Sequence, residues 1–150
     1  MSGIDETSRI KPAAERPLRR RGVVAVITRG DEFLVIRRSQ FVRAPGKFCF
    51  PGGGLERGES EPVALRRELQ EELAAEARIV RRLWASSTPG GLQLAWWRAE
   101  LMDGSVLEPN LAEVESIHWL TARRLRDHPH LLPTNREFLA ALERREFCLD

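Results

Sequence analysis

Three glutamates in one short segment have the spacing required to bind a metal ion and phosphate. Glu68, Glu71 and Glu72 stand at positions i, i+3 and i+4 of a predicted helix, so their side chains project from one face within about one turn. Three like charges at this spacing repel one another, and a divalent cation removes that repulsion. Carboxylate oxygens suit Mg²⁺, with Mn²⁺ as a substitute. We therefore expect these three side chains to ligate Mg²⁺.

The surrounding residues predict how this helix is positioned. Leu65, Leu69 and Leu73 form a second stripe about 100° around the helix, so the helix can pack on a sheet while its glutamates face a cleft. Ser60 is a suitable N-cap. Glycines at 52–54 allow close approach of the backbone to a ligand, and a turn there would direct the Gly52 carbonyl at the same metal.

The window from 53 to 75, GGLERGESEPVALRRELQEELAA, resembles the Nudix box, G-x5-E-x7-R-E-U-x-E-E-x-G-U, in which U is a bulky aliphatic residue. The matching positions are Gly53, Glu59, Arg67, Glu68, Leu69, Glu71 and Glu72. Arg67 is expected to point away from the glutamate stripe and to pair with Glu59, so that Gly53, Glu59 and Arg67 support the site. Ala74 replaces the usual glycine. The helix is expected either to end there in a left-handed conformation, at a cost of roughly 1 kcal/mol, or to run on to about Glu76.

This resemblance implies an α/β fold, an α/β/α sandwich with a mixed β-sheet between helices, over residues 18 to at least 125. The order of predicted elements agrees: strands at 22–27, 33–36, 48–50, 78–85, 92–101 and 116–120, and helices in the box, at 121–125 and at 135–145. We expect residues 1–17 to form a flexible tail and residues 18–150 to form one domain.

The resemblance also implies metal-dependent hydrolysis of a nucleoside diphosphate linked to another group. Glu68 is the first candidate for the general base and Glu72 the second. Arg38 is placed as in MutT-type enzymes, where an arginine meets substrate phosphate. Phe50 is expected either to wall the nucleotide pocket or to pack in the core. Glu113 is the candidate for a further metal ligand, with Glu115 as its rival.

The leading substrate class is a nucleoside triphosphate. The alternatives are ADP-ribose or a nucleotide sugar, which the position of Pro89 suggests, and a Nudix-like module that binds nucleotide without cleaving it. Basic and acidic residues nearly balance, 24 against 22, which makes nucleic acid an unlikely partner. No apolar run is long enough to span a membrane, and the two cysteines form no motif. We expect a cytoplasmic protein that binds a small nucleotide, with a homodimer as a possible assembly.

Overall fold

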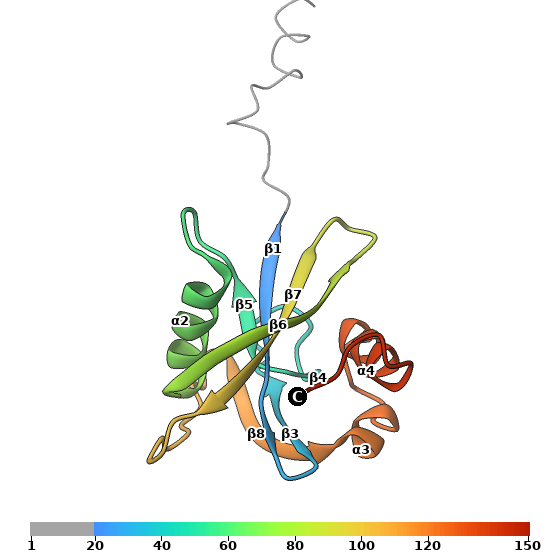
Figure 1. The fold of residues 1–150 in the computed structure, drawn as a ribbon. Helices are drawn as coiled ribbons and strands as arrows, with labels where there is room; N and C mark the ends of the chain where they lie inside the picture. The colour runs from blue at the N-terminus through green and yellow to red at the C-terminus, as the bar shows by residue number, and fades with distance from the viewer. Residues whose placement is uncertain (1–19) are drawn as a thin grey trace, which may run out of the picture.

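The computed structural model describes residues 20–150, so the tail predicted at 1–17 lies outside the described residues. Strands lie between α2 on one side and the pair α3 and α4 on the other (Figure 1). The strands are β1 (Arg21–Val26), β2 (Thr28–Arg29), β3 (Glu32–Arg38), β4 (Phe48–Cys49), β5 (Gly52–Gly54), β6 (Ala77–Ser87), β7 (Gln93–Leu101) and β8 (Val114–Thr121). The helices are α2 (Glu61–Leu73), α3 (Ala122–Arg126) and α4 (Pro133–Glu143). The predicted α/β class is confirmed.

The strands form two sheets rather than one continuous sheet. The first has the order β5-β1-β7-β6, and it is mixed because β1 runs parallel to β7 while the other pairs are antiparallel. The second is antiparallel and places β3 between β4 and β8, with β2 also paired to β3. The chain leaves the first sheet after Val26, and β3 then pairs with β8 instead of β1.

Two apolar cores lie on opposite faces of β1. Val23 and Ala25 belong to the core that receives the leucines of α2, whereas Val24 and Val26 belong to the core that receives Phe138 of α4. This alternation follows from the two-residue period of a strand. The adjacent Trp96 and Trp97 of β7 likewise join opposite cores. Helices therefore cover both faces, which confirms the predicted sandwich.

The glycine segment is a strand and not the turn predicted from the sequence. Gly52 and Gly53 pair with Val24 and Val23 of β1 in an antiparallel register. A Cβ at Gly52 would overlap the Val23 carbonyl, and one at Gly53 would overlap the Glu68 carboxylate. The glycines are needed here because the strand and the helix leave no space for side chains.

The ends of α2 follow from local hydrogen bonding. The Ser60 hydroxyl accepts a hydrogen bond from the backbone N–H of Val63 at 3.3 Å, which confirms the predicted N-cap. At the other end Ala74 adopts the left-handed conformation, with φ 52° and ψ 29°, and its N–H donates to the Gln70 carbonyl. The alternative in which the helix continues to Glu76 is wrong, because Ala74 takes the conformation that the family's glycine favours.

Replacing Ala74 with glycine should stabilise the protein. Glycine pays no steric penalty for positive φ, so Ala74→Gly should raise the free energy of unfolding, by up to about 1 kcal/mol, in urea titrations. Ala75→Gly is the matched control, because Ala75 is buried and has no positive φ. That substitution should lower stability, and a loss of stability in Ala74→Gly would contradict the strain argument.

Candidate active site

The inner face of α2 places two glutamates against β5. The Glu68 carboxylate covers Gly53 so closely that only glycine fits beneath it. Glu72 is 7% exposed, and its Oε1 accepts a hydrogen bond from the Gly52 N–H at 3.0 Å. Glu71 lies farther out, with its side chain 49% exposed. The i, i+3, i+4 spacing thus yields two sheltered carboxylates, Glu68 and Glu72, and one half-exposed carboxylate, Glu71.

A third sheltered carboxylate comes from Glu113, just before β8. Its Oε2 is buried and has no hydrogen-bond partner. The charge of Glu113 contributes to the raised pKa of both Glu68 and Glu72, so Glu113 lies near these two carboxylates. The rival Glu115 is half exposed and pairs with Arg37 at 2.8 Å instead. The structure therefore favours Glu113 over Glu115 as the added ligand.

The pKa values of Glu68 and Glu72 are both raised, with burial as the main cause. Burial, followed by the nearby charge of Glu68, raises the pKa of Glu72 to about 8, although the Gly52 N–H opposes the shift. Burial also raises the pKa of Glu68, against the effect of Arg67. Carboxylates that are buried together favour protonation unless a cation joins them. Together with the unpaired Glu113 oxygen, this donor set of hard oxygens fits a divalent cation such as Mg²⁺.

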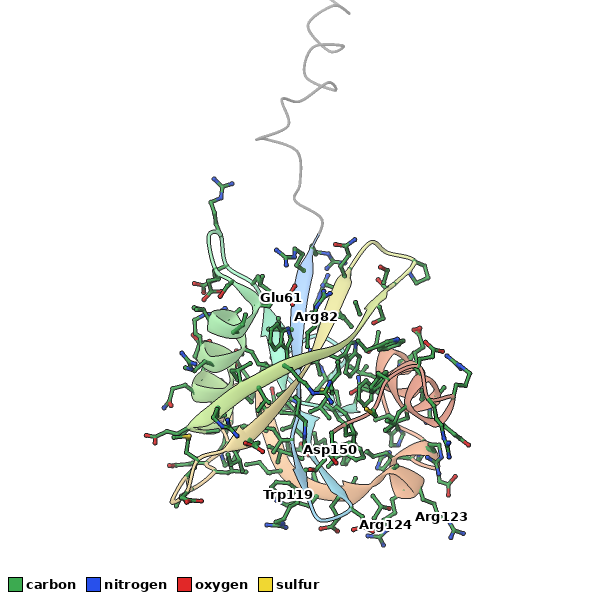
Figure 2. The ribbon with its side chains drawn as sticks, viewed as in Figure 1. Glu61, Arg82, Trp119, Arg123, Arg124 and Asp150 are labelled. Atoms are coloured by element: carbon green, nitrogen blue, oxygen red, sulfur yellow. The ribbon has the colours of Figure 1, made fainter. Side chains whose placement is uncertain are left out.

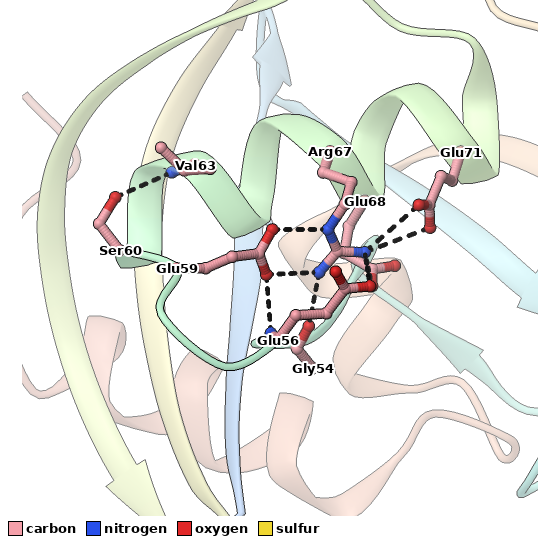
Figure 3. Close-up of polar contacts among 8 residues, drawn as sticks. All are labelled: Gly54, Glu56, Glu59, Ser60, Val63, Arg67, Glu68 and Glu71. Carbon is pink, nitrogen blue, oxygen red and sulfur yellow. Dashed lines mark hydrogen bonds and ion pairs between the residues drawn. The ribbon is translucent and has the colours of Figure 1, made fainter.

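Arg67 organises the loop before the helix and also reaches the carboxylates (Figure 3). Its guanidinium forms the expected bidentate pair with Glu59, at 2.7 and 2.8 Å, and also donates to the Gly54 carbonyl at 2.9 Å. The Arg67 hydrogen bond, followed by the backbone N–H of Glu56, lowers the pKa of Glu59 to about 2.

The prediction that Arg67 points away from the glutamate stripe is wrong. Its Nη1 lies 3.0 Å from Glu68 Oε1 and 3.3 Å from Glu71 Oε2. The reason is that Glu71 stands one turn farther along at i+4, and the planar guanidinium has donors enough for the loop and the helix together. Within residues 20–150, no group of three or more acidic, histidine or cysteine side chains stands ready to hold a metal ion. Binding a cation at Glu68 and Glu71 therefore requires Nη1 of Arg67 to give way.

A cavity of about 450 Å³ adjoins β5 on the side opposite α2. The backbone of β5 forms one wall, and apolar side chains such as Leu94 and Leu132 form others. Arg38, the candidate phosphate-binding arginine, lines it, with its Nε donating to the Arg43 carbonyl at 2.6 Å. Phe50 also lines it but is only 3% exposed and stacks on Phe33, so core packing is its main role. The cavity has room for a nucleoside, and the backbone of β5 separates it from the glutamates of α2.

Sequence reasoning missed several residues of this cavity. Asn135 at the start of α4 is 3% exposed, and its Oδ1 accepts the Phe50 N–H at 2.9 Å while its Nδ2 donates to Thr134. Arg43 and Arg20 also lie on the lining. These residues are far from the box in sequence and belong to no spacing pattern. A lone asparagine in a predicted helix gave no signal that it would face a cavity.

Comparisons with known proteins add independent findings. A model of the NUDIX domain family matches residues 18–142. The chain is 32% identical over 126 residues to the protein named "Putative 8-oxo-dGTP diphosphatase 2" of Mycobacterium tuberculosis (strain CDC 1551 / Oshkosh), covering 81% of this chain and 86% of that protein. It is 31% identical over 104 residues to the NAD-capped RNA hydrolase NudC of Pseudomonas fluorescens, covering 69% of this chain but only 37% of that protein.

Solved structures share the fold. The E. coli ORF135 protein superposes with a TM-score of 0.68 at 25% identity, over 85% of this chain and 90% of that one. A NUDIX hydrolase from Nitrosomonas europaea gives a TM-score of 0.72 at 19% identity, over 88% of this chain and 74% of that one.

In the described part of the present chain, no helix is long and apolar enough to cross a bilayer.

The buried charge of Glu72 predicts an unusual dependence of stability on pH. Its folded-state pKa of about 8 lies above the ordinary 4.5, so its contribution is fully present below pH 4.5 and is lost as pH rises through 8. Urea unfolding in EDTA should therefore show wild type losing stability relative to Glu72→Gln between pH 5 and 8.5. The lowered pKa values of His118 and His128 act equally in both proteins and cancel in the difference. Parallel curves would contradict the assignment.

Proposed function

The chain belongs to the NUDIX domain family, and from that premise we propose that it hydrolyses a nucleoside triphosphate at a phosphoanhydride bond with the help of Mg²⁺. Membership makes it a Nudix hydrolase, an enzyme that acts on phosphorus anhydrides. The observation that carries the proposal is the group of sheltered carboxylates, Glu68, Glu72 and Glu113, beside a cavity that Arg38 lines.

The residues that would hold the metal are Glu68, Glu71, Glu72 and Glu113, with the Gly52 carbonyl as a further candidate. When bound, Mg²⁺ offsets charge that develops on the phosphates and lowers the pKa of water. The structure assigns different surroundings to the glutamates. Glu72 commits one oxygen to the Gly52 N–H and is the more deeply buried, which suits a ligand, whereas Glu68 at the β5 surface remains the first candidate to take the proton from water.

The cavity suggests how the nucleotide is oriented. Arginines bind phosphate well, so Arg38 and Arg43 on the lining would hold the phosphate chain next to the carboxylates. Apolar side chains such as Leu94 and Leu132 line the part of the cavity where a base would fit, and Asn135 holds the backbone of Phe50 in that wall. Water attacking one phosphorus in line would then release the remaining phosphate group.

Two groups of similar proteins, the mycobacterial relative and the NudC proteins, support a nucleotide substrate. The mycobacterial relative is named for a nucleoside triphosphate, and this chain spans most of its length. The NudC proteins are named for a cap on RNA, and this chain spans 37% of the P. fluorescens example. For ADP-ribose and nucleotide sugars, the only indication was Pro89, which lies in the hairpin turn between β6 and β7, where the turn itself explains it.

A module that binds without cleaving would have no need for buried like charges. Their cost is borne in the metal-free protein, as the raised pKa of Glu72 indicates, and an enzyme recovers that cost when a cation binds. This favours catalysis over simple binding. The homodimer and the cytoplasmic location stay predictions.

Chromatography of the nucleotide products formed with Mg²⁺ from a panel of dGTP, 8-oxo-dGTP, ADP-ribose and UDP-glucose tests the proposal. We expect the triphosphates to be cleaved fastest. Glu72→Gln and Glu71→Gln should each lower kcat at least about 100-fold while circular dichroism stays unchanged, because each removes a charged oxygen ligand. Glu115→Gln is the matched control, since Glu115 pairs with Arg37 outside the carboxylate group. Full activity of Glu72→Gln would refute the site, and a preference for ADP-ribose would refute the substrate class.

A further inference from the structure

Glu61 makes an unusual set of contacts at the first residue of α2. Its Oε1 accepts from the indole Nε1 of Trp97 at 2.8 Å and from Arg82 Nε at 3.1 Å, and its Oε2 accepts from Arg21 Nη2 at 2.8 Å. These donors belong to β7, β6 and β1 respectively. Figure 2 labels Glu61 and Arg82 where α2 begins and β6 crosses the sheet. One carboxylate therefore joins the start of the helix to three strands.

The other attachment of α2 to this sheet runs through β5. Arg67 donates to the Gly54 carbonyl, and Glu72 accepts from the Gly52 N–H. Among the described residues, Glu61 is the α2 side chain that makes polar contacts with the remaining strands β1, β6 and β7. In addition to the packing of its leucines in the core, the helix is thus held by polar contacts at two places, about two to three turns apart. The metal-facing carboxylates lie at the second of them.

The space between α2 and β5 leaves little tolerance for movement. Glu68 rests on Gly53 with no room for a Cβ, and Glu72 holds a 3.0 Å hydrogen bond to the same strand. If the start of the helix were released, the leucines of α2 would still pack in the core, but the helix could tilt slightly about β5. Such a tilt would change the separation of the carboxylates from the Gly52 backbone and from Glu113. Cations such as Mg²⁺ demand strict ligand geometry, so a small tilt weakens binding.

The Glu61 carboxylate is suited to join the helix to the strands through ion pairs. Burial alone raises its pKa, but the Trp97 indole and the two arginines outweigh that effect and the pKa lies below its ordinary value. A carboxylate in the first turn also interacts favourably with the helix dipole. Beside it lies an open hollow of about 360 Å³ lined by Arg21, Arg82 and Gln93. Truncating Glu61 there would admit water instead of leaving a void in the core.

We propose that Glu61 is a positioning residue for the reaction, an inference that rests on the function proposed above. By fastening the start of α2 to β1, β6 and β7, it sets the placement of Glu68 and Glu72 over β5, and with it the affinity for the divalent cation. Glu61 touches neither substrate nor metal. Its effect reaches the site through the tilt of the helix.

Titration of the metal-free protein with Mn²⁺ alone, followed by electron paramagnetic resonance, tests this inference. Glu61→Ala should weaken Mn²⁺ binding on the order of tenfold, the size typical of outer-shell partners of metal ligands. Glu61→Gln should have a smaller effect, because its carbonyl still accepts from Trp97 while the ion pairs are lost. Trp97→Phe removes the indole donor and part of the ring but leaves both ion pairs of Glu61, so it should weaken binding less than Glu61→Ala. In steady-state assays at fixed Mg²⁺, kcat should fall while KM for the nucleotide changes less than about twofold.

Glu100→Gln is the matched control. Glu100 pairs with Arg78 across β6 and β7, and it contacts no residue of α2. That variant should keep the Mn²⁺ affinity of wild type. If Glu61→Ala lowers only the melting temperature and binds Mn²⁺ as tightly as wild type, the role is merely structural and the inference is overturned. If wild type itself binds no Mn²⁺, the proposed function fails first.

Discussion

The close packing of α2 on β5 is the constraint on which the rest of the site depends. Gly53 lets the strand lie directly under the helix, and the Glu68 carboxylate takes the space that a side chain would fill, while Gly52 lets the same strand lie close to β1. Because that contact is so short, Glu72 can reach the backbone of the same strand and become almost fully buried. Burial then raises its pKa, and Glu113 brings a further acidic group into the same space. The electrostatic character of the site is thus a consequence of steric fit.

Arg67 makes this concentration of negative charge compatible with a folded, metal-free protein. It pairs with Glu59 in the loop and contacts Glu68 and Glu71 on the helix, so a single guanidinium offsets several carboxylates. A role that looked purely structural in the sequence is therefore also electrostatic. The same side chain that fixes the loop competes with a cation for two of the predicted ligands.

The sequence was most informative where chemistry depends on spacing along one element. The positions of Glu68, Glu71 and Glu72 on a helix with a leucine stripe followed from helical geometry, and so did the cap at Ser60. Ala74 was harder, because propensity alone leaves open whether alanine ends a helix or continues it, and the structure shows that it ends the helix.

Features that depend on contacts between distant segments were out of reach. The division into two sheets arises from pairing between β3 and β8, which lie about 80 residues apart. Asn135 meets Phe50 across a similar distance, and no local pattern marks it. The sequence left open the choice between Glu113 and Glu115 because both lie at the start of the same strand. Their contacts in the structure distinguish them: one oxygen of Glu113 has no hydrogen-bond partner, whereas Glu115 forms an ion pair with Arg37.

The position of β6 also bears on how copies of the protein meet. It is the last strand in the order of its sheet and runs for eleven residues, and a long outer strand invites pairing with another chain. Arg78, Arg81 and Arg82 are all exposed along it. Arg78 and Arg82 are paired with Glu100 and Glu61, so an edge-to-edge approach of two molecules would have to strip water from these ion pairs and from Arg81, and that cost would discourage aggregation through this border. Arg82 thus protects the edge of the sheet with the same side chain that it offers to Glu61.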